Sequence, residues 1–216
     1  MNILRPALLA CFLLSSAHAQ ERAPERKVVG SVIASAREPA ARVVLPKEAV
    51  YLGAERFDLY GIADCEIHVF VEADAKKAVQ RLYWVQFEGY LPSKPDSTYG
   101  YNGATVKIGA DDYYVRARFG TAADPIREGS DAAHMLAMVK RAGYAMPTET
   151  MNVRLVNLLD ATRRRELMII YIEDLAFAGV KAAALIQDGK PTLQWQEIEK
   201  ALITRALGRV KVEKTP

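Results

Sequence analysis

The chain has 216 residues, of which half are hydrophobic, and its formal net charge is +3 at pH 7. A chain of this size and apolar content can bury one sizeable core, so a single domain is expected. A charge so near neutral argues against a general binder of nucleic acid or of anionic membranes, because such proteins concentrate basic residues in a patch.

The first twenty residues have the three parts of a secretory signal peptide. Arg5 supplies the positive charge, Ala7–Leu14 is an apolar run too short to span a bilayer, and an Ala-His-Ala cleavage site ends at Ala19. We therefore expect residues 1–19 to be removed, which would make the mature protein periplasmic or secreted and leave it without a transmembrane segment. A lipoprotein acylated at Cys11 is the alternative, which the continuation of the apolar run past Cys11 disfavours.

Residues 20–47 contain three prolines, many alanines and scattered charges, and this composition predicts a flexible N-terminal arm. Val28–Ile33 and Val43–Leu45 have the composition of an edge strand, but Gly30 and the prolines weaken that interpretation. Residues 48–216 are then expected to form a single α+β domain.

Three segments alternate between apolar and polar residues with the period of a β-strand. Cys65–Glu72 and Arg81–Glu88 are joined by a short connector, which predicts an antiparallel hairpin. Asp112–Phe119 follows residues 91–111, whose glycines and prolines predict a long loop. Cys65 falls on the apolar face of its strand and is predicted to be a buried, unreactive thiol.

Two segments carry the end signals of helices. Ser130–Ala142 begins with a residue suited to the N-cap and is followed by Gly143, a common C-terminal stop. Leu193–Leu207 follows Thr192, which is also suited to the N-cap.

Between these helices, Met151–Leu159 and Glu166–Glu173 predict a second hairpin. The segment Glu166–Glu173 has six consecutive apolar residues, and half of its eight residues are β-branched or aromatic, so it is expected to be a strand in the middle of a sheet. Ile169 and Ile170 point to opposite faces of such a strand, and both faces are therefore expected to be covered.

Hairpins dominate this order of elements, and strands do not alternate regularly with helices. The fold class predicted is α+β: a twisted antiparallel sheet of about five to six strands built from hairpins, with two main helices packed on one face.

Glu66 and His68 share one face of the first hairpin strand, and Gln86 and Glu88 of the neighbouring strand could join them. A carboxylate beside an imidazole suits acid–base chemistry or ligand binding, but a solvated strand face has the same composition. The sequence contains no recognised metal motif or nucleophile–base motif. A cysteine–histidine pair is disfavoured because Cys65 and His68 point to opposite faces. No catalytic residue, metal site or cofactor is therefore assigned.

Arg116 and Arg118 share a strand face with Tyr114, and this set could recognise a carboxylate or a sugar. Tyr99 and Tyr101 lie in the long loop, where rigid amphipathic side chains favour a binding surface. The alternative is a surface ladder of charged and aromatic residues.

The function expected from these patterns is that of an exported, soluble, non-catalytic binding or interaction domain of a bacterial-type cell envelope. Its partner would be a small molecule, a glycan or a protein, but not a nucleic acid. Two alternatives stay open: a hydrolytic enzyme that uses Glu66 and His68, and a subunit of an envelope assembly that docks through an exposed sheet edge.

Overall fold

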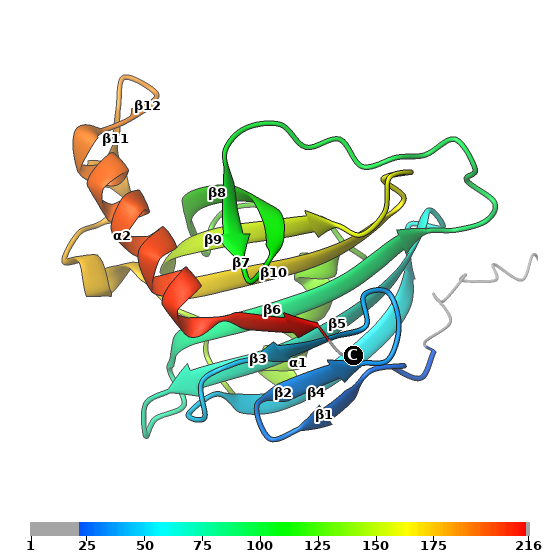
Figure 1. Cartoon of the computed structure of the whole chain (residues 1–216). Helices are drawn as coiled ribbons and strands as arrows, with labels where there is room; N and C mark the ends of the chain where they lie inside the picture. The colour runs from blue at the N-terminus through cyan, green and yellow to red at the C-terminus, as the bar shows by residue number, and fades with distance from the viewer. Residues whose placement is uncertain (1–21, 215–216) are drawn as a thin grey trace, which may run out of the picture.

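The computed structural model describes residues 22–214, so the predicted signal peptide lies outside the described residues. The main element is an antiparallel sheet of seven strands (Figure 1). These strands are β4 (Val50–Leu59), β5 (Ala63–Ala73), β6 (Val79–Tyr90), β7 (Thr105–Ile108), β8 (Asp111–Thr121), β9 (Glu149–Leu158) and β10 (Arg165–Asp174). Their order in the sheet is β4-β5-β6-β10-β9-β8-β7, and both predicted hairpins, β5–β6 and β9–β10, are present. The α+β class with antiparallel hairpins is confirmed, but the sheet is larger than the five to six strands expected.

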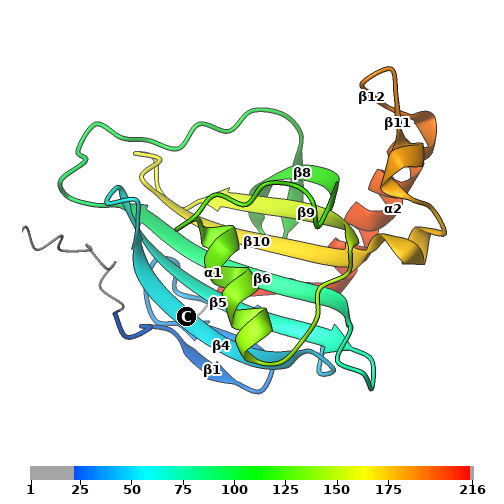
Figure 2. The ribbon, with the colours of Figure 1, turned by 180° about the vertical axis from the view of Figure 1, so that it is seen from behind.

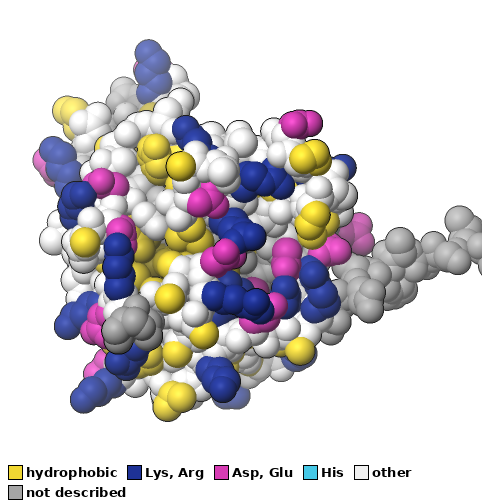
Figure 3. Space-filling view, turned by 45° about the vertical axis from the view of Figure 1, so that its right-hand side comes forward, with side chains coloured by type: hydrophobic (Ala, Val, Ile, Leu, Met, Phe, Trp, Pro, Cys, Tyr) yellow, Lys and Arg dark blue, Asp and Glu magenta, His cyan; other side chains and the backbone are white. Residues whose placement is uncertain are grey.

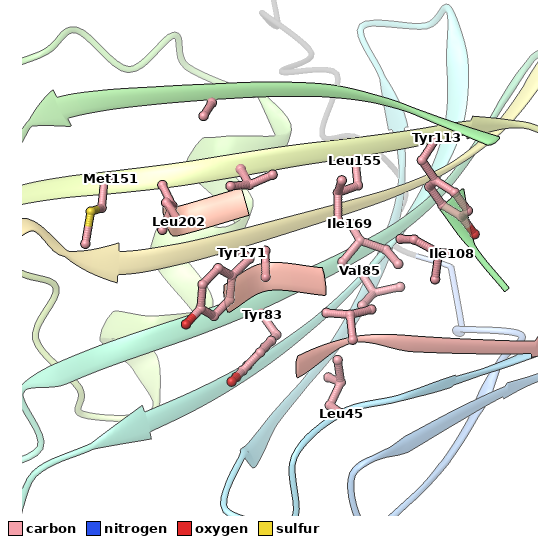
Figure 4. Close-up of a cluster of buried hydrophobic side chains, with 14 of the residues drawn as sticks. Leu45, Tyr83, Val85, Ile108, Tyr113, Met151, Leu155, Ile169, Tyr171 and Leu202 are labelled. Carbon is pink, nitrogen blue, oxygen red and sulfur yellow. The ribbon is translucent and has the colours of Figure 1, made fainter. Parts of the chain in front are cut away.

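Strand β10 lies in the middle of the seven, between β6 and β9, as its run of apolar residues predicts. The fully buried Ile169 opposes Val85 on β6 and Leu155 on β9, and the three side chains lie in one apolar cluster (Figure 4). Five of the six apolar residues of the run are buried, and the exception is Ile170, which is only partly buried. The expectation that both faces of the sheet are covered at this point is therefore wrong for the face of Ile170.

A second sheet has four strands. It combines β1 (Lys27–Val29), β2 (Val32–Ser35) and β3 (Ala41–Val44) with the C-terminal strand β13 (Lys211–Lys214), in that order. Its residues Ile33 and Val43 are fully buried in the same core as Ile169. The flexible arm expected over residues 20–47 is therefore wrong for most of its length, because alternate apolar side chains of β2 and β3 cover one face of the larger sheet.

The two helices lie on opposite faces of the seven-stranded sheet (Figures 1 and 2). The first, α1 (Asp131–Arg141), contacts β4 and β5 and shares a buried cluster with Leu82 and Trp84 of β6. The second, α2 (Leu193–Arg209), contacts β8 and β9 and belongs to the cluster of Tyr83 and Val85. The prediction that both helices pack on one face is wrong, because the central strands present apolar side chains on both faces and each face needs a cover.

Both helices begin where the sequence predicts. The hydroxyl of Ser130 accepts a hydrogen bond from the Ala133 amide at the start of α1, and that of Thr192 accepts one from the Trp195 amide at the start of α2. Each cap satisfies an amide that has no partner within the first turn of the helix.

The remaining elements are short. They are the 3-10 helices η1 (Leu175–Ala178) and η2 (Ala182–Leu185) and the paired strands β11 (Ile186–Gln187) and β12 (Lys190–Pro191).

The loop before β7 is held by Arg164 of the β9–β10 turn, whose Nη1 donates to the carbonyls of Lys94 and Ser97 at 2.7 and 2.8 Å. No helix in residues 22–214 is long and apolar enough to cross a membrane.

Cys65 lies on the α1 face of β5 and is fully buried, as its strand position predicts. Burial, together with the nearby carboxylates of which Glu88 is the foremost, raises the pKa of the Cys65 thiol well above its usual value. The thiol is therefore protonated at neutral pH and is packed as a small apolar side chain.

Candidate functional site

Part of the sheet face that carries α1 is open. Helix α1 contacts β4 and β5. The even-numbered residues of β8, β9 and β10 point to the same face of the sheet but lie outside the area that this helix covers. A groove of about 210 Å³ is found there. It is lined by Arg116, Arg118, Asn152, Arg154 and Ile170. This groove, called the arginine groove below, explains why Ile170 is not fully buried.

The arginine groove concentrates positive charge. Arg116 on β8 directly opposes Arg154 on β9, an arrangement that is unfavourable for like charges. Within residues 22–214, Arg116 and Arg118 form neither an ion pair nor a side-chain hydrogen bond. Partial burial, followed by the charges of Arg116 and Arg154, lowers the pKa of Arg118. Guanidinium groups that lack a counter-charge and lie together in a groove suit an oxyanion ligand.

One loop tyrosine, Tyr101, connects this groove to a buried carboxylate. Arg154 Nη2 donates a hydrogen bond to Tyr101 Oη at 2.8 Å, and the Arg154 guanidinium lies 5.3 Å from the centre of the Tyr101 ring. The Tyr101 hydroxyl in turn donates to Glu166 Oε2 at 2.6 Å. The ring of Tyr101 lies 5.6 Å from that of Tyr114 and 6.5 Å from that of Tyr99. Five of the seven residues proposed from the sequence therefore gather on this face: Tyr99, Tyr101, Tyr114, Arg116 and Arg118.

A pair of acidic residues lies behind these tyrosines. Glu88 on β6 opposes Glu166 on β10, and the Tyr99 hydroxyl donates to Glu88 Oε1 at 2.8 Å. Burial raises the pKa of both carboxyls, and it raises that of Glu166 to about 7 with a further contribution from the charge of Glu88. The fully buried Gln86 donates to Glu88. The expectation that Gln86 and Glu88 join Glu66 is wrong, because the β5–β6 register places them on the face of Cys65.

Glu66 and His68 lie together on the other face of the sheet, and both are 1% exposed. Each carboxylate oxygen of Glu66 accepts two hydrogen bonds: Oε1 from the Arg26 amide and His68 Nε2, and Oε2 from the Glu25 amide and Arg26 Nη1, all at 2.9–3.0 Å. His68 Nδ1 lies 3.2 Å from Tyr51 Oη. Because a carboxylate has about four acceptor positions, Glu66 has none left for a substrate. Its contacts tie the N-terminal segment to the sheet.

A larger pocket, of about 470 Å³, lies beside Glu66. Five arginines and five acidic residues line it, and every one of these arginines forms an ion pair with an acidic residue of the lining. Basic and acidic side chains are likewise interspersed on the face of the molecule seen in Figure 3. The charges of this pocket therefore balance one another, whereas those of the arginine groove do not.

Sequence patterns missed Asn152, Arg154 and Glu166. The first two are the polar residues that alternate with Met151, Val153 and Leu155, and this alternation was visible. Asn152 and Arg154 lie near Arg116 because β8 pairs with β9. Helix α1 separates these two strands in the sequence, so no local pattern predicts their pairing. In the described part of the chain, no three His, Cys, Asp or Glu side chains are placed to hold a metal ion.

Comparisons with protein-family models, with curated proteins and with solved structures found no match. Functional conclusions about this chain therefore depend on the geometry of the sites described above.

Proposed function

We propose that this chain is an exported, non-catalytic binding protein of a bacterial-type cell envelope, and that its arginine groove holds a small molecule through a carboxylate or phosphate group. The observation that carries the proposal is the group of three guanidiniums on β8 and β9, two of which have no acidic partner in residues 22–214. An oxyanion would replace the repulsion between these groups with charge-assisted hydrogen bonds. Asn152 offers a further donor, and Ile170 offers an apolar floor.

No observation favours the hydrolytic alternative. The carboxylate of Glu66 is saturated with hydrogen bonds, and both ring nitrogens of His68 face protein partners. The two residues therefore offer neither a free base nor a free acid to a substrate.

Export is supported by the charge, apolar length and cleavage site of residues 1–19. We expect N-terminal sequencing of the protein recovered from its own host to begin at Gln20. An intact Met1, or a lipid-modified Cys11, would contradict this part of the proposal.

Anion binding can be measured by titrating the protein with sulfate and following the backbone amide NMR signals, with chloride at matched ionic strength as the reference. We expect saturable shifts centred on β8 and β9. The double substitution R116A/R118A should weaken sulfate binding by about tenfold or more, because each variant side chain loses a charge-assisted hydrogen bond.

The matched control is R42A. Arg42 is an exposed arginine on β3 of the other sheet, 3.7 Å from Glu213. Its removal lowers the net charge without touching the arginine groove, so sulfate affinity should change little. R42A removes one positive charge and R116A/R118A removes two. If the loss of binding free energy in R42A is at least half of that in the double variant, only the overall charge matters, and the proposed site is contradicted.

A further inference from the structure

Arg154 belongs to two groups of side chains at once. Its guanidinium lines the arginine groove opposite Arg116, and its Nη2 also lies 3.8 Å from Glu166 Oε1. The side chain of Arg154 is 41% exposed, whereas that of Glu166 is 1% exposed. One guanidinium therefore lies between a buried carboxylate and a groove that is open to solvent.

Tyr101 closes the connection. It accepts a hydrogen bond from Arg154 at 2.8 Å and donates one to Glu166 at 2.6 Å. An ionised Glu166 accepts the hydrogen bond of Tyr101 and attracts Arg154, which orients both toward the interior. A protonated Glu166 holds neither of them by charge, which leaves the positive charge of Arg154 available to the groove.

We propose that proton uptake at Glu166 controls the affinity of the arginine groove for anions, with Arg154 and Tyr101 as the connection between the two. This inference rests on the proposed function, since it concerns the regulation of the same groove. A bound anion and the Glu166 carboxylate are like charges that share one guanidinium. Binding of either the anion or the proton therefore favours binding of the other, and the coupling is reciprocal.

The surroundings of Glu166 determine where it titrates. Charged or titratable groups face it from every neighbouring element: Glu88 on β6, Arg154 on β9, Asp131 on α1, Cys65 on β5, and Tyr90, Tyr99 and Tyr101 at the end of β6 and in the loop. Burial is the largest influence and raises the pKa of Glu166 to about 7; Glu88 and Asp131 add to this, and Tyr101 and Arg154 oppose it. The carboxyl therefore changes charge within the neutral range.

Neither of the described histidines accounts for a titration in the groove at neutral pH. His68 lies on the opposite face of the sheet, and His134 of α1 lies 2.9 Å from Glu55 of β4 and stacks on Phe57. Glu166 is therefore the group to test.

The experiment is a sulfate titration of the full mature chain at about pH 6 and about pH 8, at constant ionic strength. Sulfate stays a dianion over this range, whereas phosphate would itself titrate. We expect sulfate to bind about fivefold more tightly at the lower pH, a ratio within the usual range of coupling between two sites. Calorimetry in buffers of different ionisation enthalpy should show uptake of a fraction of one proton with each sulfate at neutral pH.

Two variants test whether Glu166 is the group that takes up the proton. E166Q replaces the carboxyl with a neutral group of similar shape and should bind sulfate tightly at both pH values, without proton uptake. E88Q removes the neighbouring carboxylate and should keep the pH dependence, with its midpoint moved to lower pH because a like charge is lost. Sulfate binding that is independent of pH in the parent chain, or that keeps its pH dependence in E166Q, would overturn the inference. An absence of sulfate binding at every pH would overturn the proposed function as well.

Discussion

Replacing Ile169 with alanine is expected to lower the free energy of unfolding by about 3–4 kcal/mol, within the range found for fully buried isoleucines. Its side chain is 0% exposed and contacts the apolar cluster that joins the two sheets and α2 (Figure 4). The cavity left behind lies between β6 and β9, where neighbouring strands prevent the backbone from closing in. Urea unfolding followed by circular dichroism measures the loss.

Ile170→Ala is the internal comparison and should cost only about 1 kcal/mol, because Ile170 is partly exposed at the base of the arginine groove. The uninterrupted apolar run of β10 predicts similar losses for both isoleucines, whereas the structure predicts unequal ones. Two equally large losses would mean that the face of Ile170 is covered and that the groove is not open to a ligand.

This difference illustrates what a sequence can predict. The place of β10 in the middle of the sheet and the N-caps at Ser130 and Thr192 depend on short stretches of chain, and they were predicted. Three of the four residues of β13 are charged, and the strand pairs with β3, which lies near the other end of the chain. Such a pairing is fixed by the tertiary fold and leaves no local pattern.

The candidate site divides in the same way. Arg116, Arg118 and Tyr114 could be grouped from strand periodicity alone, because they lie two residues apart on one strand. Arg154 joins them only through the pairing of β8 with β9. Burial raises the pKa of Glu166. The buried carboxyl contacts Tyr101 of the long loop, and these two residues are 65 positions apart in the sequence. The sequence therefore predicted part of the groove but not its connection to a buried carboxyl.

Glu66→Ala is expected to cost about 3–5 kcal/mol of unfolding free energy at neutral pH, the range found when one partner of a buried ion pair is removed. Four donors lose their acceptor at once: the amides of Glu25 and Arg26, the guanidinium of Arg26, and His68 Nε2. Glu66→Gln should not recover the lost stability. The side-chain NH2 of the glutamine would replace one carboxylate oxygen and would face two donors without accepting a hydrogen bond from either. The control is Glu213→Ala, since Glu213 is half exposed and its weak ion pair with Arg42 is worth less than about 1 kcal/mol.

The pH dependence of this loss identifies the charge of Glu66 as its cause. Burial opposes ionisation of the carboxyl, but the hydrogen bonds from His68 and from the Glu25 and Arg26 amides, together with the charge of Arg26, outweigh it and lower the pKa of Glu66 to about 2. Because the folded-state pKa lies below the unfolded value of about 4.5, the stabilisation is complete above that value. It disappears as the pH falls toward 2, and it is on the order of 3 kcal/mol.

The test is to measure the free energy of unfolding by urea for the parent chain and for the Glu66→Ala variant. The measurements are made at several pH values between neutral pH and a pH of about 2. The gap in stability between the two should be widest near neutral pH and should narrow steadily below about 4.5, because only the parent chain has the ionised carboxylate to lose. A gap that stays constant over this range would mean that the side chain stabilises the fold by packing and not by its charge. Glu66 would then no longer be the group that ties the N-terminal segment to the sheet through charge-assisted hydrogen bonds.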